Sequence, residues 1–238
     1  MITGGATGLG GAMVRAFAGQ GANVGFVDID EASGRELVAE IGSSTSAPWF
    51  MRVDVTDVAS LKAAIADFAA HAGHFSVLIN NVGNDTRHDP ASTTEAIWRG
   101  ALAVNLDAAF FATQAAIAVM AGKGGTIVNI SSINAITGPP QMPGYVAAKS
   151  ALLGLTKALA REYGPEGVRV NCILPGWVVT DRQLKLWLTP EAEEAWMRDV
   201  PLKRRIMPDD AARLALFLAS DDSAMITGQH FTIDGGRT

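Results

Sequence analysis

Short apolar runs alternate with stretches of helical periodicity along the whole chain. Between the apolar runs, hydrophobic residues recur at the three- and four-residue spacing of amphipathic helices. Strands that alternate with helices predict an α/β protein with a doubly wound parallel sheet, right-handed crossovers and helices on both faces. The strand candidates lie near residues 1–3, 23–29, 49–53, 75–80, 125–131, 168–174 and 230–233, and the helical ones at 8–21, 31–41, 58–72, 94–121, 144–163 and 209–219.

Length and composition favour a single domain over residues 1–238. A chain of 238 residues, 48% of them hydrophobic, can bury one sizeable core, and we find no linker. The first strand is unusual, because only Met1-Ile2-Thr3 precede a glycine-rich stretch, whereas strands usually have about 5–6 residues. Either the strand begins upstream of this sequence or a very short strand is tolerated.

The charge pattern argues against nucleic-acid and membrane partners. The net charge is −5 and the densest basic cluster is Lys203-Arg204-Arg205, so the electrostatic footprint of a nucleic-acid binder is missing. No signal-peptide pattern opens the chain, and no uninterrupted apolar run reaches the ~18 residues of a membrane span. The single cysteine, Cys172, can form no internal disulfide, which suits a reducing compartment. We therefore expect a cytoplasmic protein.

A tyrosine, a lysine and a serine in the middle of the chain are the main candidates for chemistry. Tyr145 and Lys149 stand four residues apart in a predicted helix and so share one face. An ammonium group a few ångströms from a phenol favours the phenolate by roughly 1–3 pKa units. Ser132 follows the apolar strand 125–131, so we expect its hydroxyl at the carboxyl end of that strand. Together these three side chains indicate a site that exchanges a proton with an alcohol or carbonyl. The alternative is that Tyr and Lys stand at this spacing by chance.

A glycine-rich stretch at the start of the chain predicts a nucleotide site. Thr3-Gly4-Gly5-Ala6-Thr7-Gly8-Leu9-Gly10 leads directly into the helix 8–21. Glycines let the backbone approach a pyrophosphate, and the free N–H groups and positive dipole of the helix N-terminus favour its charge. A plain turn between strand and helix is the alternative for the glycines alone.

These motifs together resemble the short-chain dehydrogenase/reductase family. The resemblance rests on Thr3-Gly4-x-x-x-Gly8-x-Gly10 with Tyr145-x-x-x-Lys149, and it extends over essentially the whole chain. It also includes Asn80-Asn81-Val82-Gly83 and Ile226-Thr227-Gly228-Gln229. The family implies a Rossmann-type fold, a nicotinamide cofactor and hydride transfer at a CH–OH carbon. The catalytic residues that the resemblance implies are Asn105, Ser132, Tyr145 and Lys149.

The resemblance further implies which residues hold the cofactor. Pro175-Gly176 opens the loop expected to cover the nicotinamide, and Thr180 resembles the family's carboxamide ligand. Val82 replaces the family's alanine, a mild departure because that contact is expected to be largely backbone. We expect no metal site. The cofactor-binding residues are expected to be Gly4, Thr7, Gly8, Leu9, Gly10, Asp28, Ile29, Asp54, Val55, Asn81, Val82, Gly83, Tyr145, Lys149, Pro175, Gly176, Val178 and Thr180.

Asp28 favours NAD over NADP. It ends the second predicted strand 18 residues after Gly10, close to the spacing of about 20 residues for the acidic group that binds the adenosine ribose hydroxyls. Its carboxylate would repel a 2′-phosphate, and no Arg or Lys precedes Gly8 to attract one. The alternative is that Asp28 merely caps the helix beginning at Asp30 or Glu31.

The mechanism implied by the family is proton transfer at Tyr145. In the oxidising direction Tyr145 takes the hydroxyl proton, Lys149 lowers its pKa and holds the nicotinamide ribose, and Ser132 orients the substrate oxygen. Asn105 is expected to tie Lys149 to a water chain. As an alternative, Asn105 is an ordinary polar residue inside the helix 94–121, a position for which Asn has only modest propensity.

The substrate should be set by the variable segment 176–208 and by loop edges. Hydrogen-bonding groups beside tryptophans suit a polyhydroxylated ring, whereas steroid or long acyl pockets should be mostly apolar. The blocks 84–88 and 175–187 also resemble the bacterial sugar (aldose) 1-dehydrogenases of the family. Arg87, Asp85 and Trp187 are further candidates for contact with the sugar. The alternative for Arg87 and Asp85 is a salt-linked surface loop, and for Trp187 a helix anchor over the cleft. The expected substrate residues are Asn84, Asn134, Gln141, Trp177 and Arg182.

Two other functional classes remain open at this point. A general ketone or 3-oxoacyl reductase would use the same catalytic residues, but usually with NADPH, which Asp28 disfavours. A non-catalytic NAD-binding module is also compatible with the fold, because fold does not determine function. The complete set of Ser132, Tyr145, Lys149 and Asn105 argues against it.

Two helices suggest self-association. The helices 94–121 and 144–163 carry apolar residues on several sides, more than one sheet can cover. The family resemblance places these helices at a two-fold interface, with a further contact near the C-terminus. Closed symmetry of this kind is common in soluble oligomers. We expect a homotetramer with dihedral symmetry, a dimer being the alternative.

Overall fold

The seven predicted strands form one parallel sheet. The computed structural model describes residues 1–42, 46–120 and 122–238. The strand order is β3-β2-β1-β4-β5-β6-β7 and every neighbouring pair is parallel, which confirms the doubly wound α/β fold. The strands are β1 (Ile2–Thr3), β2 (Gly25–Asp28), β3 (Trp49–Arg52), β4 (Val77–Asn80), β5 (Gly125–Ile130), β6 (Val168–Pro175) and β7 (His230–Ile233).

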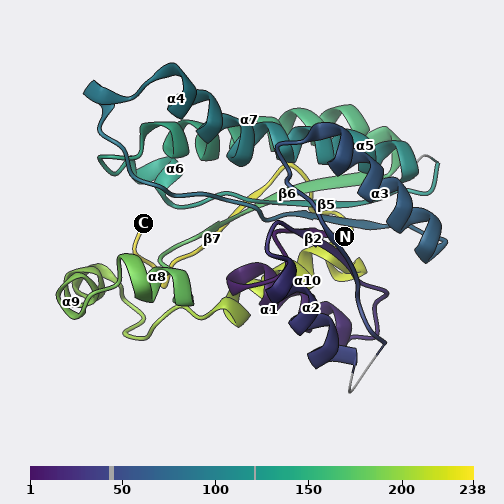
Figure 1. The fold of residues 1–238 in the computed structure, drawn as a ribbon, viewed down its shortest axis with the longest axis horizontal. Helices are drawn as coiled ribbons and strands as arrows, with labels where there is room; N and C mark the ends of the chain where they lie inside the picture. Colours follow the sequence, from purple (N-terminus) through teal and green to yellow (C-terminus); the bar gives the residue numbers. More distant parts are fainter. Residues whose placement is uncertain (43–45, 121) are drawn as a thin grey trace.

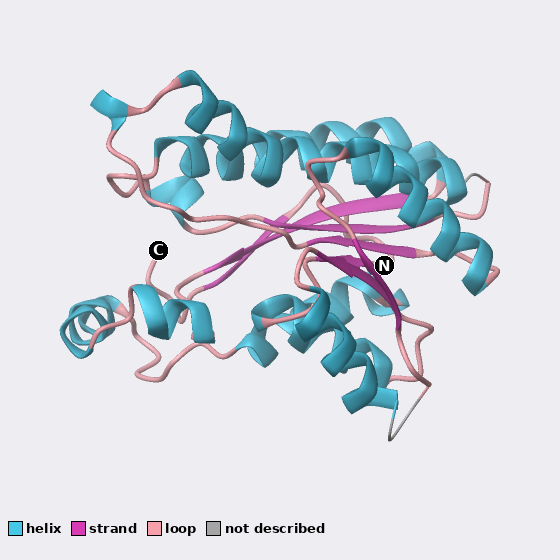
Figure 2. Ribbon diagram, in the orientation of Figure 1, coloured by secondary structure: helices cyan, strands magenta, loops and turns pink. Residues whose placement is uncertain are grey.

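Helices cover both faces of the sheet, as Figures 1 and 2 show. Successive strand residues therefore point into two different cores: Leu78 and Ile127 belong to one apolar cluster, Ile79 and Val128 to the other. One layer contains α3 (Val58–Ala72), α5 (Ala108–Met120) and α7 (Pro143–Tyr163); the other contains α1 (Gly8–Gly19), α2 (Glu31–Gly42) and α10 (Pro208–Ala219).

The predicted helix 94–121 is not one regular helix. A π-helical turn interrupts it, because the Asn105 side chain donates to the Ala101 carbonyl at 2.9 Å, within the turn before it. The last predicted residue, 121, lies outside the described residues. The three parts are α4 (Glu95–Leu102), the π-helical turn η2 (Ala103–Asp107) and α5.

The segment 176–208 contains two helices that its sequence did not predict. They are α8 (Asp181–Leu186) and α9 (Pro190–Asp199), and both begin at a threonine whose hydroxyl caps the helix. The other short elements are η1 (Pro90–Ser92), α6 (Asn134–Thr137), η3 (Gly164–Glu166) and η4 (Asp221–Ser223).

The run from Glu95 to Met120 is long and apolar enough to cross a membrane by length and composition alone. Its second half packs in the core of this fold: Ala112, Ala116 and Met120 are fully buried in the cluster shared with α3 and the sheet. Packing on the sheet and on α3 therefore accounts for the buried apolar residues of this second half.

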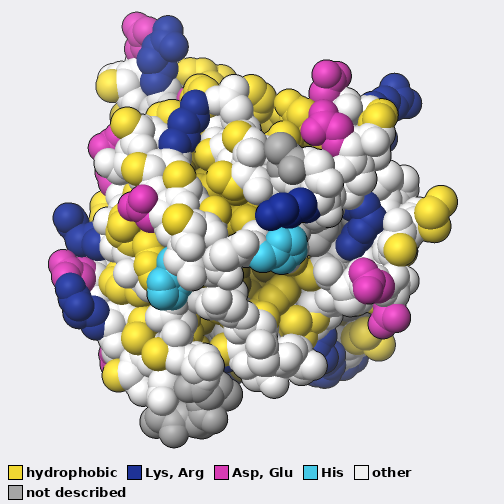
Figure 3. Space-filling view, turned by 90° about the vertical axis from the view of Figure 1, so that its right-hand side faces the viewer, with side chains coloured by type: hydrophobic (Ala, Val, Ile, Leu, Met, Phe, Trp, Pro, Cys, Tyr) yellow, Lys and Arg dark blue, Asp and Glu magenta, His cyan; other side chains and the backbone are white. Residues whose placement is uncertain are grey.

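The two ends of the sheet differ in character. At the amino ends of the strands, apolar side chains and histidines gather in the middle of the surface, with charged side chains mainly around them (Figure 3). A hollow of about 260 Å³ lies at this end, between the starts of β1, β2 and β4. The large cavity lies at the opposite end, where the strands finish.

Candidate active site

A cavity of about 1360 Å³ lies at the carboxyl ends of the strands. The predicted segments 4–10, 80–83, 131–132 and 175–176 meet there, at the point where the chain changes direction between β1 and β4. Of the predicted catalytic, cofactor and substrate residues, all line this cavity except Asn105 and Gln141. Residues far apart in the sequence are thus brought to one site.

The glycine loop has the shape of a phosphate cradle. Gly4 and Gly8 have φ angles of 65° and 54°, a region that favours glycine. A Cβ at Gly10 would lie 1.9 Å from the Gly4 carbonyl oxygen, so any side chain there is incompatible with the turn. Thr7, at the N-cap of α1, makes no side-chain cap, which leaves the first amides of α1 without an intrahelical or side-chain partner. These features fit a dinucleotide pyrophosphate.

Asn81 braces the same loop from the end of β4. Its Nδ2 donates to the carbonyl oxygens of Thr3 at 3.1 Å and Gly4 at 2.9 Å, and its backbone N–H donates to the Thr3 hydroxyl at 3.0 Å. Asn81 therefore holds the glycine loop in register with β4, in addition to lining the cavity.

Asp28 is tied to the glycine loop and does not cap α2. Its Oδ2 accepts from the Ala6 N–H at 2.9 Å and its Oδ1 from the Asp30 N–H at 3.0 Å. The cap of α2 is Asp30, which accepts from the Ser33 N–H at 3.1 Å. The capping alternative for Asp28 is thus wrong. Asp28, Asp30 and Asp54 make this end of the cavity acidic.

Tyr145 and Ser132 face the cavity from α7 and the end of β5. Burial raises the pKa of Tyr145 to about 12; a hydrogen bond from Ser132 acts in the opposite direction, and the charge of Asp85 adds to the increase. Ser132 Oγ also accepts from the Asn134 N–H at 3.1 Å. The serine hydroxyl is therefore fixed beside the phenol, where it can share a substrate oxygen.

Lys149 does not lower the pKa of Tyr145 in this structure, contrary to the expectation from the sequence. Its Nζ lies 5.7 Å from the centre of the Tyr145 ring and donates to the Ile130 carbonyl oxygen at 2.8 Å. The lysine is 2% exposed, and burial lowers its own pKa to about 8. Desolvation is the main cause of both shifts: it disfavours the charged form of each group, raising the pKa of Tyr145 and lowering that of Lys149.

Asn105 is buried next to Lys149 but outside the cavity lining. Its Oδ1 accepts from the Asn84 N–H at 2.8 Å and its Nδ2 donates to the Asn84 carbonyl at 3.1 Å. A Cβ at Gly83 would lie 3.3 Å from Lys149 Nζ and 3.5 Å from Asn105 Oδ1. The two polar groups thus flank the same glycine, while a water link between them stays a prediction.

Four of the five predicted substrate residues line the cavity: Asn84, Asn134, Trp177 and Arg182. Gln141 does not. It is exposed, with a φ of 63°, and its carbonyl accepts from the His88 N–H at 2.7 Å. Gln141 is thus placed to shape the loop beside the cavity through its backbone.

Two residues of the cavity wall carried no signal in the sequence. Trp196 on α9 meets Trp177 edge-on, with ring centres 5.6 Å apart, and Arg237 stacks on Trp196 at 4.0 Å. Both lie in segments without a motif, and only the folding of α9 and of the C-terminal turn against the cavity brings them there. The amphipathic pattern of 190–199 was the one available hint.

The buried ammonium of Lys149 should make stability depend on pH. Its folded pKa of about 8 lies below the ordinary 10.5, so the cost of burying the charge is complete below pH 8 and fades as pH rises toward 10.5. Lys149→Met removes this cost, which we expect to be larger at pH 7 than at pH 10 by roughly 2–3 kcal/mol. The melting temperature of the variant relative to wild type should therefore be higher at pH 7 than at pH 10.

Thermal unfolding at the two pH values checks this, with Lys157→Met as the control. Lys157 lies on the same helix and is exposed, so its substitution should give a difference that does not change with pH. A Lys149→Met difference equal at both pH values would contradict a depressed lysine pKa.

Comparisons with known proteins agree with the geometry. The family model described as enoyl-(acyl carrier protein) reductase matches residues 4–238. A probable galactose dehydrogenase of Rhizobium meliloti is 44% identical over 238 residues, with 99% of this chain and 93% of that protein covered. D-xylose 1-dehydrogenase of Caulobacter vibrioides is 42% identical over 237 residues, with 99% and 94% covered. A 3-oxoacyl-[acyl-carrier-protein] reductase of Chlamydia muridarum is 36% identical, with 99% and 95% covered.

A solved structure shows the same fold over almost the whole chain. A short-chain type dehydrogenase/reductase from Mycobacterium ulcerans superposes with a TM-score of 0.95 at 27% identity, covering 99% of this chain and 88% of that one. With the glycine cradle and the Ser132, Tyr145 and Lys149 cluster, these matches confirm the resemblance seen in the sequence. The chain belongs to the short-chain dehydrogenase/reductase family and is an oxidoreductase that acts on CH–OH groups.

Proposed function

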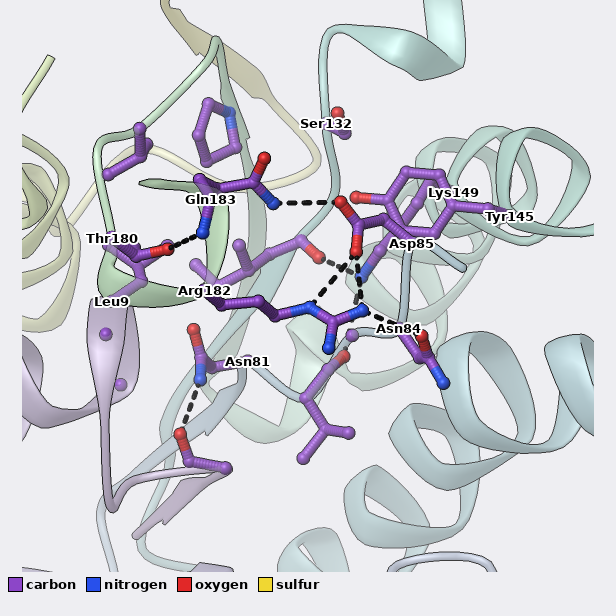
Figure 4. Close-up of a pocket in the computed structure, with 18 of the residues that line it drawn as sticks. Leu9, Asn81, Asn84, Asp85, Ser132, Tyr145, Lys149, Thr180, Arg182 and Gln183 are labelled. Atoms are coloured by element: carbon purple, nitrogen blue, oxygen red, sulfur yellow. Dashed lines mark hydrogen bonds and ion pairs between the residues drawn. The ribbon is translucent and has the colours of Figure 1, made fainter. Parts of the chain in front are cut away.

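We propose that the protein oxidises the anomeric carbon of an aldose to a lactone, with NAD as the hydride acceptor. The observation that carries the proposal is that polar side chains and the rings of Trp177 and Trp196 line the same cavity as Tyr145 and Ser132; Figure 4 shows Tyr145 and Ser132 with several of the polar side chains. Such a wall suits a polyhydroxylated ring. Relatives named as galactose and D-xylose dehydrogenases, at 44% and 42% identity, support the same substrate class.

The chain's own residues handle the proton of the reaction. Oxidation removes a hydride and a proton from the C1–OH group and leaves the lactone C=O bond; bound NAD supplies the hydride acceptor. Tyr145 takes the hydroxyl proton, and Ser132 holds the same oxygen in line. Lys149, which donates to the Ile130 carbonyl, would hold the nicotinamide ribose. Burial favours the neutral phenol, whereas only the phenolate can accept the hydroxyl proton. A positive charge brought beside Tyr145 would stabilise that phenolate.

The acidic end of the cavity is the basis for proposing NAD. Asp28→Ala removes the carboxylate that would bind the ribose hydroxyls and repel a 2′-phosphate, so the preference for NAD over NADP should narrow. The ratio of kcat/KM values for the two cofactors measures this. Because Asp28 also accepts from the Ala6 and Asp30 N–H groups, Asp28→Asn is the matched variant: it removes the charge and one acceptor but keeps an oxygen that can accept from the Ala6 N–H. An unchanged ratio in both variants would assign ribose recognition to another group.

A substrate screen tests the proposal as a whole. Wild-type protein is incubated with NAD and a panel of aldoses, sugar alcohols and simple secondary alcohols, and NADH absorbance is followed. We expect kcat/KM for at least one aldose to exceed that for every simple alcohol. The lactone should appear as acid released on its hydrolysis. Turnover of simple alcohols alone would reject the sugar assignment and leave the oxidoreductase class intact.

A 3-oxoacyl reductase is the second candidate. The matching family model is described as a reductase acting on acyl carrier protein substrates, and the Chlamydia relative carries a similar name. That reading predicts faster turnover with NADPH and a 3-oxoacyl thioester than with NAD and any aldose. The same assay, run in the reducing direction, separates the two.

We also propose a homotetramer. Exposed apolar residues remain on α4 and α5, where Ile97, Trp98 and Phe110 are 45%, 38% and 38% exposed, and large exposed apolar groups close together often mark interfaces. On α7, Leu152 and Leu159 are already buried within the chain, so α4 and α5 carry more of this argument than α7. Sedimentation at micromolar concentration should give about four times 24.9 kDa. A single species of 24.9 kDa would reject self-association.

A further inference from the structure

Helix α8 covers the substrate side of the cavity without burying any residue. None of its six residues is buried, and Leu184 and Leu186 are 47% and 50% exposed. Apolar packing therefore contributes little to its position. The contacts that hold it across the cavity are polar, and they lead to the loop after β4 (Figure 4).

Asp85, on that loop, is the anchor of these contacts. Its Oδ2 accepts from Gln183 Nε2 at 2.9 Å, and its Oδ1 accepts from Arg182 at 3.1 Å. Asp85 is the more enclosed partner, with 22% of its side chain exposed against 51% for Arg182. A half-exposed ion pair is worth little by itself, which makes the hydrogen bond from Gln183 to a charged acceptor the stronger of the two contacts.

The carbonyl oxygen of the Gln183 amide also takes part in a hydrogen bond. Its Oε1 accepts from the Trp177 Nε1–H at 2.7 Å, and Trp177 contacts Trp196 edge-on in the cavity wall. An amide has one donor end and one acceptor end. The carboxylate of Asp85 demands the donor and the indole N–H demands the acceptor, so only one orientation of Gln183 satisfies both.

We infer that Asp85 and Gln183 are positioning residues for substrate binding: the relay from Asp85 through Gln183 to Trp177 docks α8 and sets the aromatic wall of the cavity. The role of this wall in binding substrate rests on the proposed function. The docking of α8 by these hydrogen bonds does not depend on the proposed function. Asp85 and Gln183 lie 98 residues apart in the sequence, and the same two segments also meet where Arg87 stacks on Trp187, 4.1 Å from the ring centre.

If these hydrogen bonds hold α8 in place, the arrangement of their donors and acceptors should matter more than the size of the side chains. Gln183→Glu keeps the size of the side chain but sets a carboxylate against Asp85 while leaving an acceptor for Trp177. Combining it with Asp85→Asn restores one donor and one acceptor, because the introduced amide can donate to the introduced carboxylate. The double variant also has the same net charge as wild type.

Two measurements report on the relay. The first is hydrogen exchange of peptides covering 181–187, followed by mass spectrometry without substrate. Protection should fall by about tenfold in Gln183→Glu, the size expected for losing one hydrogen bond to a charged group. Protection should return to within about threefold of wild type in the double variant.

The second measurement is steady-state kinetics with an aldose. In Gln183→Glu, KM should rise by about tenfold with a smaller change in kcat, and KM should recover in the double variant.

Controls separate the relay from general effects. Gln20→Glu makes the same chemical change at an exposed site outside the cavity and should alter neither measurement. Trp177→Phe removes the indole N–H together with part of the aromatic surface that faces Trp196, so it should raise KM while leaving Asp85 and Gln183 paired and α8 largely protected. Unfolding temperatures confirm that each variant is folded.

Two results would overturn the inference. One is Gln183→Glu with wild-type exchange and KM, which would mean that the amide orientation holds nothing in place. The other is a double variant as impaired as Gln183→Glu, which would mean that reversed polarity cannot replace the native pair. If wild type oxidises no aldose, the proposed function fails, and the exchange experiment still decides whether the relay docks α8.

Discussion

Tyr145→Phe should reduce oxidation by about 10²–10⁴-fold in kcat, the usual loss when a general base is removed, while NAD affinity stays nearly unchanged. The ring remains in place on α7, and only the hydroxyl that takes the substrate proton is lost. Burial raises the pKa of the phenol to about 12, so the phenolate that accepts the alcohol proton needs stabilisation by charge brought into the site. Initial rates with NAD and the best aldose measure kcat, and fluorescence titration measures cofactor binding.

The chain offers a matched control for this substitution. Its only other tyrosine, Tyr163, lies on the same helix, packed at the edge of the apolar core. Tyr163→Phe should leave kcat unchanged. If Tyr145→Phe retained more than about a tenth of wild-type turnover, another group would have to accept the proton. A loss shared equally by both variants would indicate a general effect on α7.

Gly10→Ala should abolish measurable NAD binding. The added Cβ would lie 1.9 Å from the Gly4 carbonyl oxygen and 2.6 Å from Asn81 Nδ2, and backbone atoms cannot move aside as a flexible side chain can. The loop must open, which removes both the cradle and the contacts that Asn81 makes with it. We expect cofactor affinity to fall at least about 100-fold, a loss of about 2.7 kcal/mol, with a lower melting temperature. Isothermal titration with NAD and thermal unfolding provide the two readouts.

Gly19→Ala is the control on the same helix. Nothing lies within 4 Å of a Cβ there, and its φ is not positive. Alanine is the better helix former by about 1 kcal/mol, so this variant should bind NAD normally and be as stable as wild type or more so. Normal NAD binding by Gly10→Ala would show that the glycine loop is not the pyrophosphate site.

Features with a local cause could be predicted from the sequence. Strands and helices follow from the spacing of apolar residues, and all seven strands appear where that spacing places them. The glycine loop is recognisable because the need for glycine arises within eight residues. Tyr145 and Lys149 share a face because helix geometry alone brings residues four apart together.

Several local predictions still failed for reasons that lie elsewhere in the fold. The helix 94–121 is broken at η2, where Asn105 bonds both the Ala101 carbonyl of the preceding turn and the backbone of Asn84 in another loop. α8 and α9 were not predicted in the variable segment 176–208, although 190–199 has an amphipathic pattern. Gln141 stands near Ser132 in the sequence but outside the cavity, because a left-handed residue turns the loop there.

The sequence by itself determined the order of the strands and helices, the glycine cradle and the face shared by Tyr145 and Lys149, because each depends on neighbours within one or two turns of the chain. Tertiary structure decided the surroundings of those groups, and with them their pKa values and hydrogen-bond partners. Burial, not the nearby ammonium, governs the pKa of Tyr145, and Asp28 holds the glycine loop through Ala6, 22 residues away. Asp85 meets Gln183 across 98 residues. Desolvation and long-range hydrogen bonds depend on which segments the fold packs together, and no local spacing encodes that.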